Sequence, residues 1–293
     1  YAHILYISQG DLGWNPYVTS WIEKREKASE KVHLTSLVER YVPILHRECR
    51  RQFKSITPIS SICNIQMMCS LLDALLVSSN IPNDASFEQY ELYFVFVLIW
   101  SFGSALYDDG QTNSRSEFTK FFIRVFPEII FPDKNLSVFE YWINPANSEF
   151  TLWSEKVPKF ELDSELPIQA CLVHNSETIR LKYFLDIFVA DKFPVMMIGI
   201  AGSGKTLLMN EKLNSLGEDY QIANVPFNFY YTSAMTQKIM EKPLEKKAGR
   251  NYGPEGSKKL IYFLDDLNMP EVDKYGTVAP HTIIRQHMEF SLW

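Results

Sequence analysis

The residue types that could do chemistry in this sequence gather in two short stretches, and the first is rich in glycine. Residues Gly199 to Thr206, GIAGSGKT, match the pattern GxxxxGK[ST] in full. Gly202 and Gly204 allow the backbone to turn its N–H groups toward an anion, and a helix beginning near Lys205 adds partial positive charge. Such a loop binds a nucleotide. Lys205 is expected to reach its β- and γ-phosphates, and the Thr206 hydroxyl is expected to ligate Mg²⁺.

The second stretch is an apolar strand that ends in two acids. Residues 260–264, LIYFL, are followed directly by Asp265 and Asp266. Asp265 is expected to hold the Mg²⁺ shell, and Asp266 to lie where a base can polarise an attacking water. Taken alone, an Asp-Asp pair is equally a solvated strand end or a turn initiator. Its position after the phosphate loop, with room for one strand and one helix between them, favours the nucleotide interpretation.

The elements that must position these residues alternate between helix and strand. Periodicity predicts helices over residues 176–190, 205–216 and 233–247, and strands over residues 194–200, 221–231 and 259–264. This alternation indicates a parallel sheet.

The residues before this α/β part read differently. Residues 1–7 predict a strand and residues 9–16 a turn-rich loop. Helical periodicity then covers residues 29–54, 60–78, 87–107 and 114–125, which together predict an all-α bundle. Pro43 predicts a kink or break in the first of these helices, and the third is apolar nearly all round and should be buried. Prolines punctuate residues 127–167, where residues 138–143 and 150–153 predict a short hairpin around Asn144-Pro145.

Composition excludes several classes of function. The net charge of −6 argues against a nucleic-acid-binding protein. The apolar run from Leu92 to Trp100 is far shorter than the roughly 20 residues that span a bilayer, so no membrane partner is expected. The four cysteines have no metal-ligand spacing, which makes a zinc site or a disulfide framework unlikely on pattern alone.

A family resemblance covers essentially the whole chain. The run from FNFYYTSAMTQ through DDLNMPEVDKYGTVAPHTIIRQH is similar to the third AAA+ module of a dynein heavy chain of the axonemal kind. LGWNPYVTSWIEKRE and YELYFVFVLIWSFGSAL resemble the C-terminal half of the second module. The expected fold class is therefore α/β, an incomplete P-loop AAA+ parallel sheet preceded by an all-α AAA+ small-domain bundle and a short β-containing linker. The expected boundaries are 1–28 for the end of the second module's large subdomain, 29–126 for its small helical subdomain, 127–167 for the linker, and 168–293 for the truncated large subdomain of the third module.

The resemblance implies part of an ATP-driven, minus-end-directed microtubule motor of the ciliary or flagellar axoneme, within the cytoplasm and cytoskeleton. The third module is similar to a regulatory ATP site with slow or gated hydrolysis. Implied partners are adjacent AAA+ modules and, through regions outside this chain, microtubules and dynein intermediate and light chains. Asp266 is the implied catalytic acid, and Thr206 and Asp265 hold Mg²⁺. The implied cofactor-binding residues are Gly199, Ala201, Gly202, Ser203, Gly204, Lys205, Thr206, Leu207, Leu172 and Val173, the last two matching a segment near adenine.

Asp266 departs from the general AAA+ pattern, which has glutamate at this position. The shorter side chain places its carboxylate about 1 Å back, and such a misplacement can cost on the order of a hundredfold in rate. We therefore expect tight binding of ATP and slow turnover. Both ends of the chain look cut, and we expect the fragment alone to be inactive. Arg285 is expected to be a solvated helix charge. The alternatives are a stand-alone P-loop ATPase and a nucleotide-locked ring module that never hydrolyses.

Overall fold

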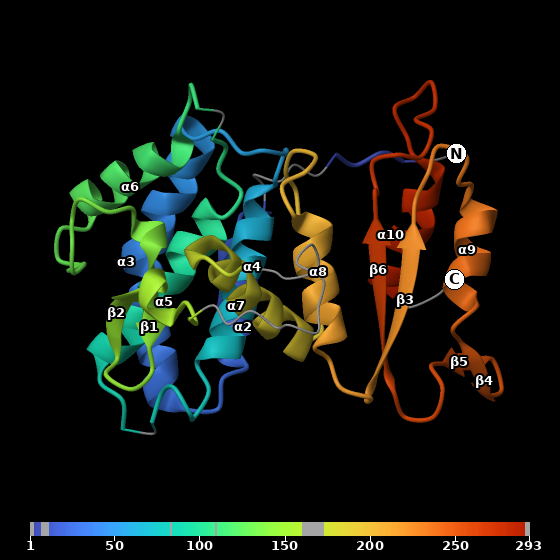
Figure 1. Cartoon of the computed structure of the whole chain (residues 1–293). Coiled ribbons are helices and arrows are strands. Elements are labelled where there is room, and N and C mark those ends of the chain that lie inside the picture. The colour runs from blue at the N-terminus through green and yellow to red at the C-terminus, as the bar shows by residue number, and fades with distance from the viewer. Residues whose placement is uncertain (1–2, 7–11, 83, 109, 160–172, 291–293) are drawn as a thin grey trace. The chain divides into compact units, whose positions relative to one another are not determined.

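The structure is a computed structural model that describes residues 3–6, 12–82, 84–108, 110–159 and 173–290. It divides into two units, Tyr1–Ile198 and Gly199–Trp293 (Figure 1). Each unit has its own helices and strands.

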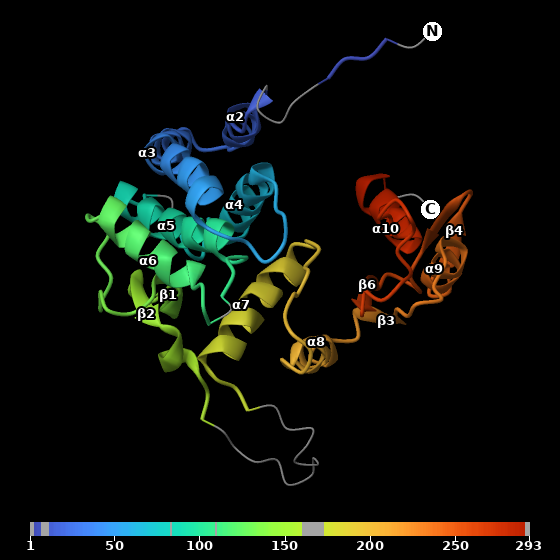
Figure 2. The same ribbon diagram turned by 90° about the horizontal axis from the view of Figure 1, so that it is seen from above.

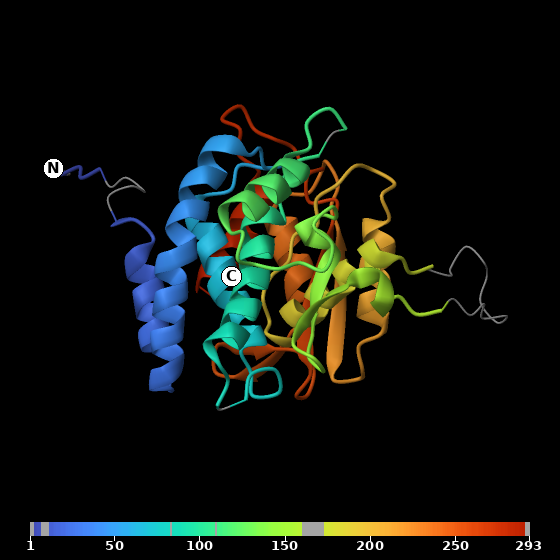
Figure 3. The same ribbon diagram turned by 90° about the vertical axis from the view of Figure 1, so that its left-hand side faces the viewer.

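Helices pack around a buried central helix in the first unit. They are the blue and green ribbons of Figure 3. Their bounds are α2 (Asn15–Glu23), α3 (Ala28–Gln52), α4 (Ser61–Leu75), α5 (Phe87–Gly103) and α6 (Ser114–Val125). Figure 2 shows α5 surrounded by α3, α4 and α6, and its contacts with α3 and α4 are extensive. The predicted all-α bundle is confirmed.

The central helix α5 is buried on every side. Every residue from Tyr93 to Gly103 is buried, as the sequence predicts for a helix that is apolar all round. Its start is fixed by a capping box, in which the Ser86 hydroxyl accepts from the Gln89 N–H and the Gln89 amide oxygen accepts from the Ser86 N–H.

The predicted hairpin forms and leads to helix α7 of the same unit. Strands β1 (Tyr141–Asn144) and β2 (Glu149–Leu152) pair antiparallel, between the 3₁₀ helices η1 (Val138–Glu140) and η2 (Trp153–Lys156). Helix α7 (Ser176–Ala190) packs against η2. The contact is aromatic: the Trp153 and Tyr183 rings lie 5.3 Å apart, and the Trp100 and Phe184 rings lie 4.5 Å apart. These rings join α7 to the helical core.

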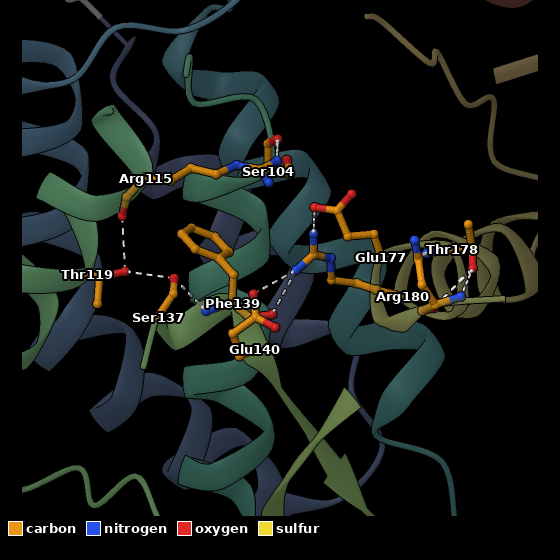
Figure 4. A network of polar contacts seen from close by, with 10 residues as sticks. Ser104, Arg115, Thr119, Ser137, Phe139, Glu140, Glu177, Thr178 and Arg180 are labelled. Atoms are coloured by element: carbon orange, nitrogen blue, oxygen red, sulfur yellow. Dashed lines mark hydrogen bonds and ion pairs between the residues drawn. The ribbon is translucent and has the colours of Figure 1, made fainter. Parts of the chain in front are cut away.

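A polar network reinforces this docking (Figure 4). Arg180 of α7 is 6 % exposed. Its guanidinium donates to the Phe139 carbonyl at 3.3 Å and lies 3.4 Å from the Glu140 carboxylate and 3.5 Å from the Glu177 carboxylate. Burial, followed by the charge of Arg180, lowers the pKa of Arg115. The Phe139 carbonyl and the two carboxylates therefore satisfy the buried guanidinium of Arg180, whose burial would be costly without these acceptors.

We expect the substitution Gly103→Ala to destabilise the first unit by about 1–3 kcal/mol. A Cβ at this position would lie 2.4 Å from Phe139 Cζ. That ring cannot withdraw easily, because it is 2 % exposed and packs against Trp100 and Phe118. Urea unfolding followed by circular dichroism measures the effect. Gly217→Ala is the control, since no atom lies within 4 Å of its Cβ position, and equal stability of the two variants would contradict the packing argument.

Two predictions for the first unit are wrong at the described residues, and a third is wrong in one of its two alternatives. Residues 3–6 form no strand and are exposed, because a strand needs a hydrogen-bonded neighbour and none of the described strands pairs with them. The predicted turn-rich loop at residues 9–16 runs at its end into helix α2, with Pro16 in the first turn, where a proline is tolerated. Of the kink or break predicted at Pro43, the structure excludes the break, because Pro43 lies inside α3 without ending it. Val42 and Leu45 on either side are fully buried.

The second unit contains a two-stranded parallel sheet with helices and a small hairpin. Its elements are α8 (Lys205–Asn214), β3 (Tyr220–Pro226), α9 (Ser233–Glu241), β4 (Glu245–Ala248), β5 (Asn251–Gly253), β6 (Lys259–Asp265) and α10 (Ala279–Phe290). Strand β3 pairs with β6 in parallel, in a register that places Tyr220 beside Lys259 and Pro226 beside Asp265. The carboxyl ends of both strands therefore meet at one edge. The α/β class with an incomplete parallel sheet is confirmed.

The second unit and the residues just before it also depart from the sequence-based expectations. Residues 193–200 form no strand among the described residues. The helix predicted over 233–247 ends at Glu241, because Pro243 cannot continue it. The following residues form the β4–β5 hairpin, whose turn contains Gly249 at φ 60°. The bounds of helix α10 were not predicted, although Arg285 was expected to lie on a helix.

Candidate nucleotide site

The glycines of the phosphate loop occupy positions that restrict the residue type. Gly202 has φ 78° and Gly204 has φ 81°, in the left-handed region where a Cβ is unfavourable. Gly204 is also the N-cap of α8. A Cβ on Gly199 would lie 3.2 Å from Ser203 Oγ. The loop backbone therefore depends on glycine at Gly202 and Gly204, whereas a Cβ on Gly199 would crowd the Ser203 hydroxyl.

The Lys205 side chain folds back over the loop. Its Nζ donates to the Ile200 carbonyl at 2.7 Å, to the Gly199 carbonyl at 3.0 Å and to Ser203 Oγ at 3.3 Å. The Ser203 hydroxyl in turn donates to the Ile200 carbonyl at 2.9 Å. A cation is thus held within the curve of the loop, beside the first N–H groups of α8, which is an arrangement suited to the negative charge of a phosphate.

The structure brings Thr206 and Asp265 together from distant parts of the sequence. Thr206 is in the first turn of α8, and Asp265 is the last residue of β6. The Thr206 hydroxyl donates to the Asp265 carboxylate at 3.2 Å. A hydroxyl and a carboxylate oxygen are ligands that Mg²⁺ prefers, so these residues fit the metal that accompanies a nucleotide.

Asp266 follows in a tight turn of left-handed backbone, with φ 54°. Its N–H donates to Asp265 Oδ1 at 3.1 Å, and its carbonyl accepts from the Met269 N–H at 2.9 Å. The residue is exposed at the carboxyl edge of the sheet. Asp266 therefore directly follows the residue whose carboxylate accepts from the Thr206 hydroxyl, at the carboxyl edge of the sheet.

The remaining predicted residues contribute less. Ala201 is exposed, and Leu207, in the first turn of α8, is 43 % exposed. Val173 belongs to the first unit and is 57 % exposed, whereas Leu172 lies outside the described residues. Arg285 pairs with Glu289 one turn along α10, at 3.7 Å, as a solvated helix charge does.

Sequence reasoning missed two contacts around the site. His281 Nε2 lies 2.7 Å from the Leu267 carbonyl, next to Asp266. The Tyr262 hydroxyl of β6 donates to the Met240 carbonyl of α9, and burial raises the pKa of Tyr262 to about 12. Neither has a recognisable spacing, because both depend on tertiary packing.

The structure also bears on metal clusters and membrane spans. Among the residues that it describes, no three His, Cys, Asp or Glu side chains gather as a metal-ligand group. Within the same residues, every helix is too short or too polar to cross a bilayer.

Comparison with known proteins identifies the family of both units. Residues 34–155 match a model described as the dynein heavy chain AAA lid domain, and residues 160–293 match the P-loop containing dynein motor region. The ciliary dynein beta chain of Heliocidaris crassispina is 54 % identical over 292 residues, and dynein axonemal heavy chain 17 of Homo sapiens is 53 % identical over 293 residues. The flagellar outer-arm dynein alpha chain of Chlamydomonas reinhardtii is 36 % identical over 304 residues.

These relatives are much longer than the present chain. Each of the three matches covers 100 % of this chain, but only 6 % of the Heliocidaris and human proteins and 7 % of the Chlamydomonas protein. A P-loop dynein motor region implies nucleotide binding, in agreement with the cation, hydroxyl and carboxylate that the loop and the sheet edge bring together. The chain belongs to the dynein heavy chain family, of which it carries an AAA lid domain and a P-loop motor region.

Proposed function

We propose that the second unit binds ATP with Mg²⁺ as a regulatory site in the AAA+ ring of an axonemal dynein. The observation that carries this proposal is the hydrogen bond from the Thr206 hydroxyl to the Asp265 carboxylate, directly after a loop whose carbonyls hold the Lys205 ammonium. Lys205 and the loop N–H groups bind the phosphates, and Thr206 and Asp265 hold the metal. The metal neutralises charge on the phosphates when it is bound.

Asp266 is the proposed acid that orients the attacking water. Its side chain is one methylene shorter than the glutamate of the general AAA+ pattern, so hydrolysis is slow and binding is retained. Slow turnover suits a gate better than a power stroke. In the intact motor, turnover at this site as fast as at the first module's site would contradict this assignment.

The substitution Asp266→Asn tests the role of this acid. Asparagine also adopts left-handed backbone readily, so the variant removes the charge with little change to the turn. We expect turnover at this site to fall by roughly a hundredfold, with ATP affinity within about twofold of the parent. Single-turnover hydrolysis and equilibrium binding measure the two quantities, and Asn268→Ala, three residues from Asp265, serves as a neighbouring control. Unchanged turnover would favour the alternative of a nucleotide-locked ring module.

For the whole protein, we propose an ATP-driven, minus-end-directed microtubule motor of cilia or flagella. The proposed boundaries are 1–28 and 29–126 for parts of the second module, 127–167 for the linker and 168–293 for the third module. Adjacent AAA+ modules are the direct partners. Microtubules and the intermediate and light chains bind elsewhere in the heavy chain. The support is the identity to proteins with ciliary, axonemal and flagellar names, and an immunoblot of ciliated and non-ciliated tissue tests it.

A further inference from the structure

We propose that His281 is a positioning residue for Asp266, through a hydrogen bond to the peptide that follows the acid. This inference rests on the proposed ATP hydrolysis at this site. It concerns a residue of α10, outside both the phosphate loop and the acidic strand end.

The contact defines the protonation of the imidazole nitrogen involved. His281 Nε2 lies 2.7 Å from the Leu267 carbonyl oxygen. A carbonyl oxygen can only accept a hydrogen bond, so Nε2 must carry the proton. The side chain is half-buried, where a peptide carbonyl that loses its donor is not fully compensated by water. The bond therefore fixes the peptide plane between Leu267 and the next residue.

Contacts with α9 hold the start of helix α10, which carries this imidazole. Its first residue, Ala279, accepts a hydrogen bond from Ser233 Oγ of α9 at 2.7 Å. Pro280 is buried, and α9 and α10 pack closely along their lengths. The position of His281 is thus supported by the contact between these two helices.

The carbonyl held by His281 belongs to the central peptide of the turn from Asp266 to Met269. The turn is closed by the Met269 N–H, which donates to the Asp266 carbonyl, and the Asp266 N–H donates to Asp265. Left-handed backbone at Asp266 persists only while such contacts hold it, since it is a sparsely populated conformation. Loss of the His281 bond loosens one of these restraints and lets the carboxylate move.

A displaced acid affects turnover but not nucleotide binding, because the phosphates are held by the loop and by Thr206 and Asp265. We expect His281→Ala to lower single-turnover hydrolysis roughly tenfold to a hundredfold. The affinity for a fluorescent ATP analogue should stay within about twofold of the parent. His281→Gln should restore most of the rate, because its side-chain amide can present an N–H donor at a similar distance from the helix.

The experiment uses the full-length heavy chain with the phosphate-loop lysines of the other modules replaced by alanine, so that bound and hydrolysed ATP report this site. His287→Gln is the matched control, because it makes the same kind of substitution in the last turn of the same helix. Burial lowers the pKa of His287, and this residue lies six positions after His281. The control should leave both quantities unchanged.

Each outcome either supports or overturns the positioning role of His281. Reduced turnover in His281→Ala, unchanged affinity and recovery in His281→Gln support the positioning role. Equal turnover in the parent and His281→Ala overturns it, as does an equal loss of affinity and rate without recovery in His281→Gln. A parent that binds ATP but never hydrolyses it also overturns the role and leaves a locked ring module. A parent that binds no ATP overturns the proposed function itself.

Discussion

We expect the replacement of Lys205 by alanine to abolish tight ATP binding at this site. The ammonium is the cation that the loop holds at its centre, within 2.7–3.3 Å of three loop oxygens. A charge-assisted hydrogen bond contributes about 1.5–3 kcal/mol. Loss of two such bonds to a nucleotide, about 3–6 kcal/mol, weakens binding by about a hundredfold or more. Titration of the full-length chain with a fluorescent ATP analogue, with the other sites disabled, measures this loss.

The matched control for this variant is Lys212→Ala. Lys212 lies in the last turn of α8, so the control removes the same charge from the same helix but leaves the loop intact. In the otherwise unmodified motor, Lys205→Ala should also change the microtubule gliding velocity while the first site keeps its hydrolysis. Unchanged affinity would refute the assignment of the loop. Lost affinity with unchanged velocity would leave a site that binds ATP without regulating the motor.

The largest expected effect on stability comes from Trp153→Ala, with a loss of about 3–5 kcal/mol. The indole is 0 % exposed and lies between the Trp142 ring at 6.1 Å and the Tyr183 ring at 5.3 Å. Its removal leaves a cavity between the hairpin and α7 that a packed core fills only in part. Urea unfolding of the 293-residue chain, followed by far-ultraviolet circular dichroism, measures the change.

Trp14→Ala is the control for this variant, since Trp14 is only half-buried at the start of α2. We expect it to cost markedly less than the core substitution. A similar loss in both variants would mean that α7 does not share the core of the helical unit. Retained stability in Trp153→Ala would mean that the neighbouring rings close the cavity.

The helical part of the fold could be predicted because its signals are local. The bounds of α6 and α7 agree with the apolar spacing to the residue, and each begins with an asparagine whose side chain accepts from a backbone N–H of the first turn. The hairpin likewise has its turn marked by Asn144 and Pro145. In these segments propensity, capping and burial all agree.

Strands were predicted less well, because a strand exists only when a neighbour pairs with it. The apolar pattern of residues 194–200 resembles that of β6, yet only β6 has a partner among the described strands. The pattern records that a segment is suited to a sheet. It does not record whether the other strand is beside it.

The sequence likewise predicts some residues of the candidate site but not their contacts. The loop glycines and Lys205 could be predicted, since their spacing along the chain carries the chemistry. The distance between Thr206 and Asp265 depends on how α8 lies against β6. The contact between His281 and Leu267 depends on the packing of α9 and α10. Such contacts between helices and loops leave no periodic trace in a sequence.

The left-handed backbone at Asp266 links the length of the acid to the shape of the turn. Aspartate and asparagine enter this conformation more readily than most residues, whereas a longer side chain such as glutamate meets the ordinary cost of about 1–2 kcal/mol. The single substitution Asp266→Glu would lengthen the acid and, at the same time, strain the left-handed turn that holds it. If the site is slow as proposed, its conversion into a fast ATPase by evolution or design requires at least one compensating change in the turn.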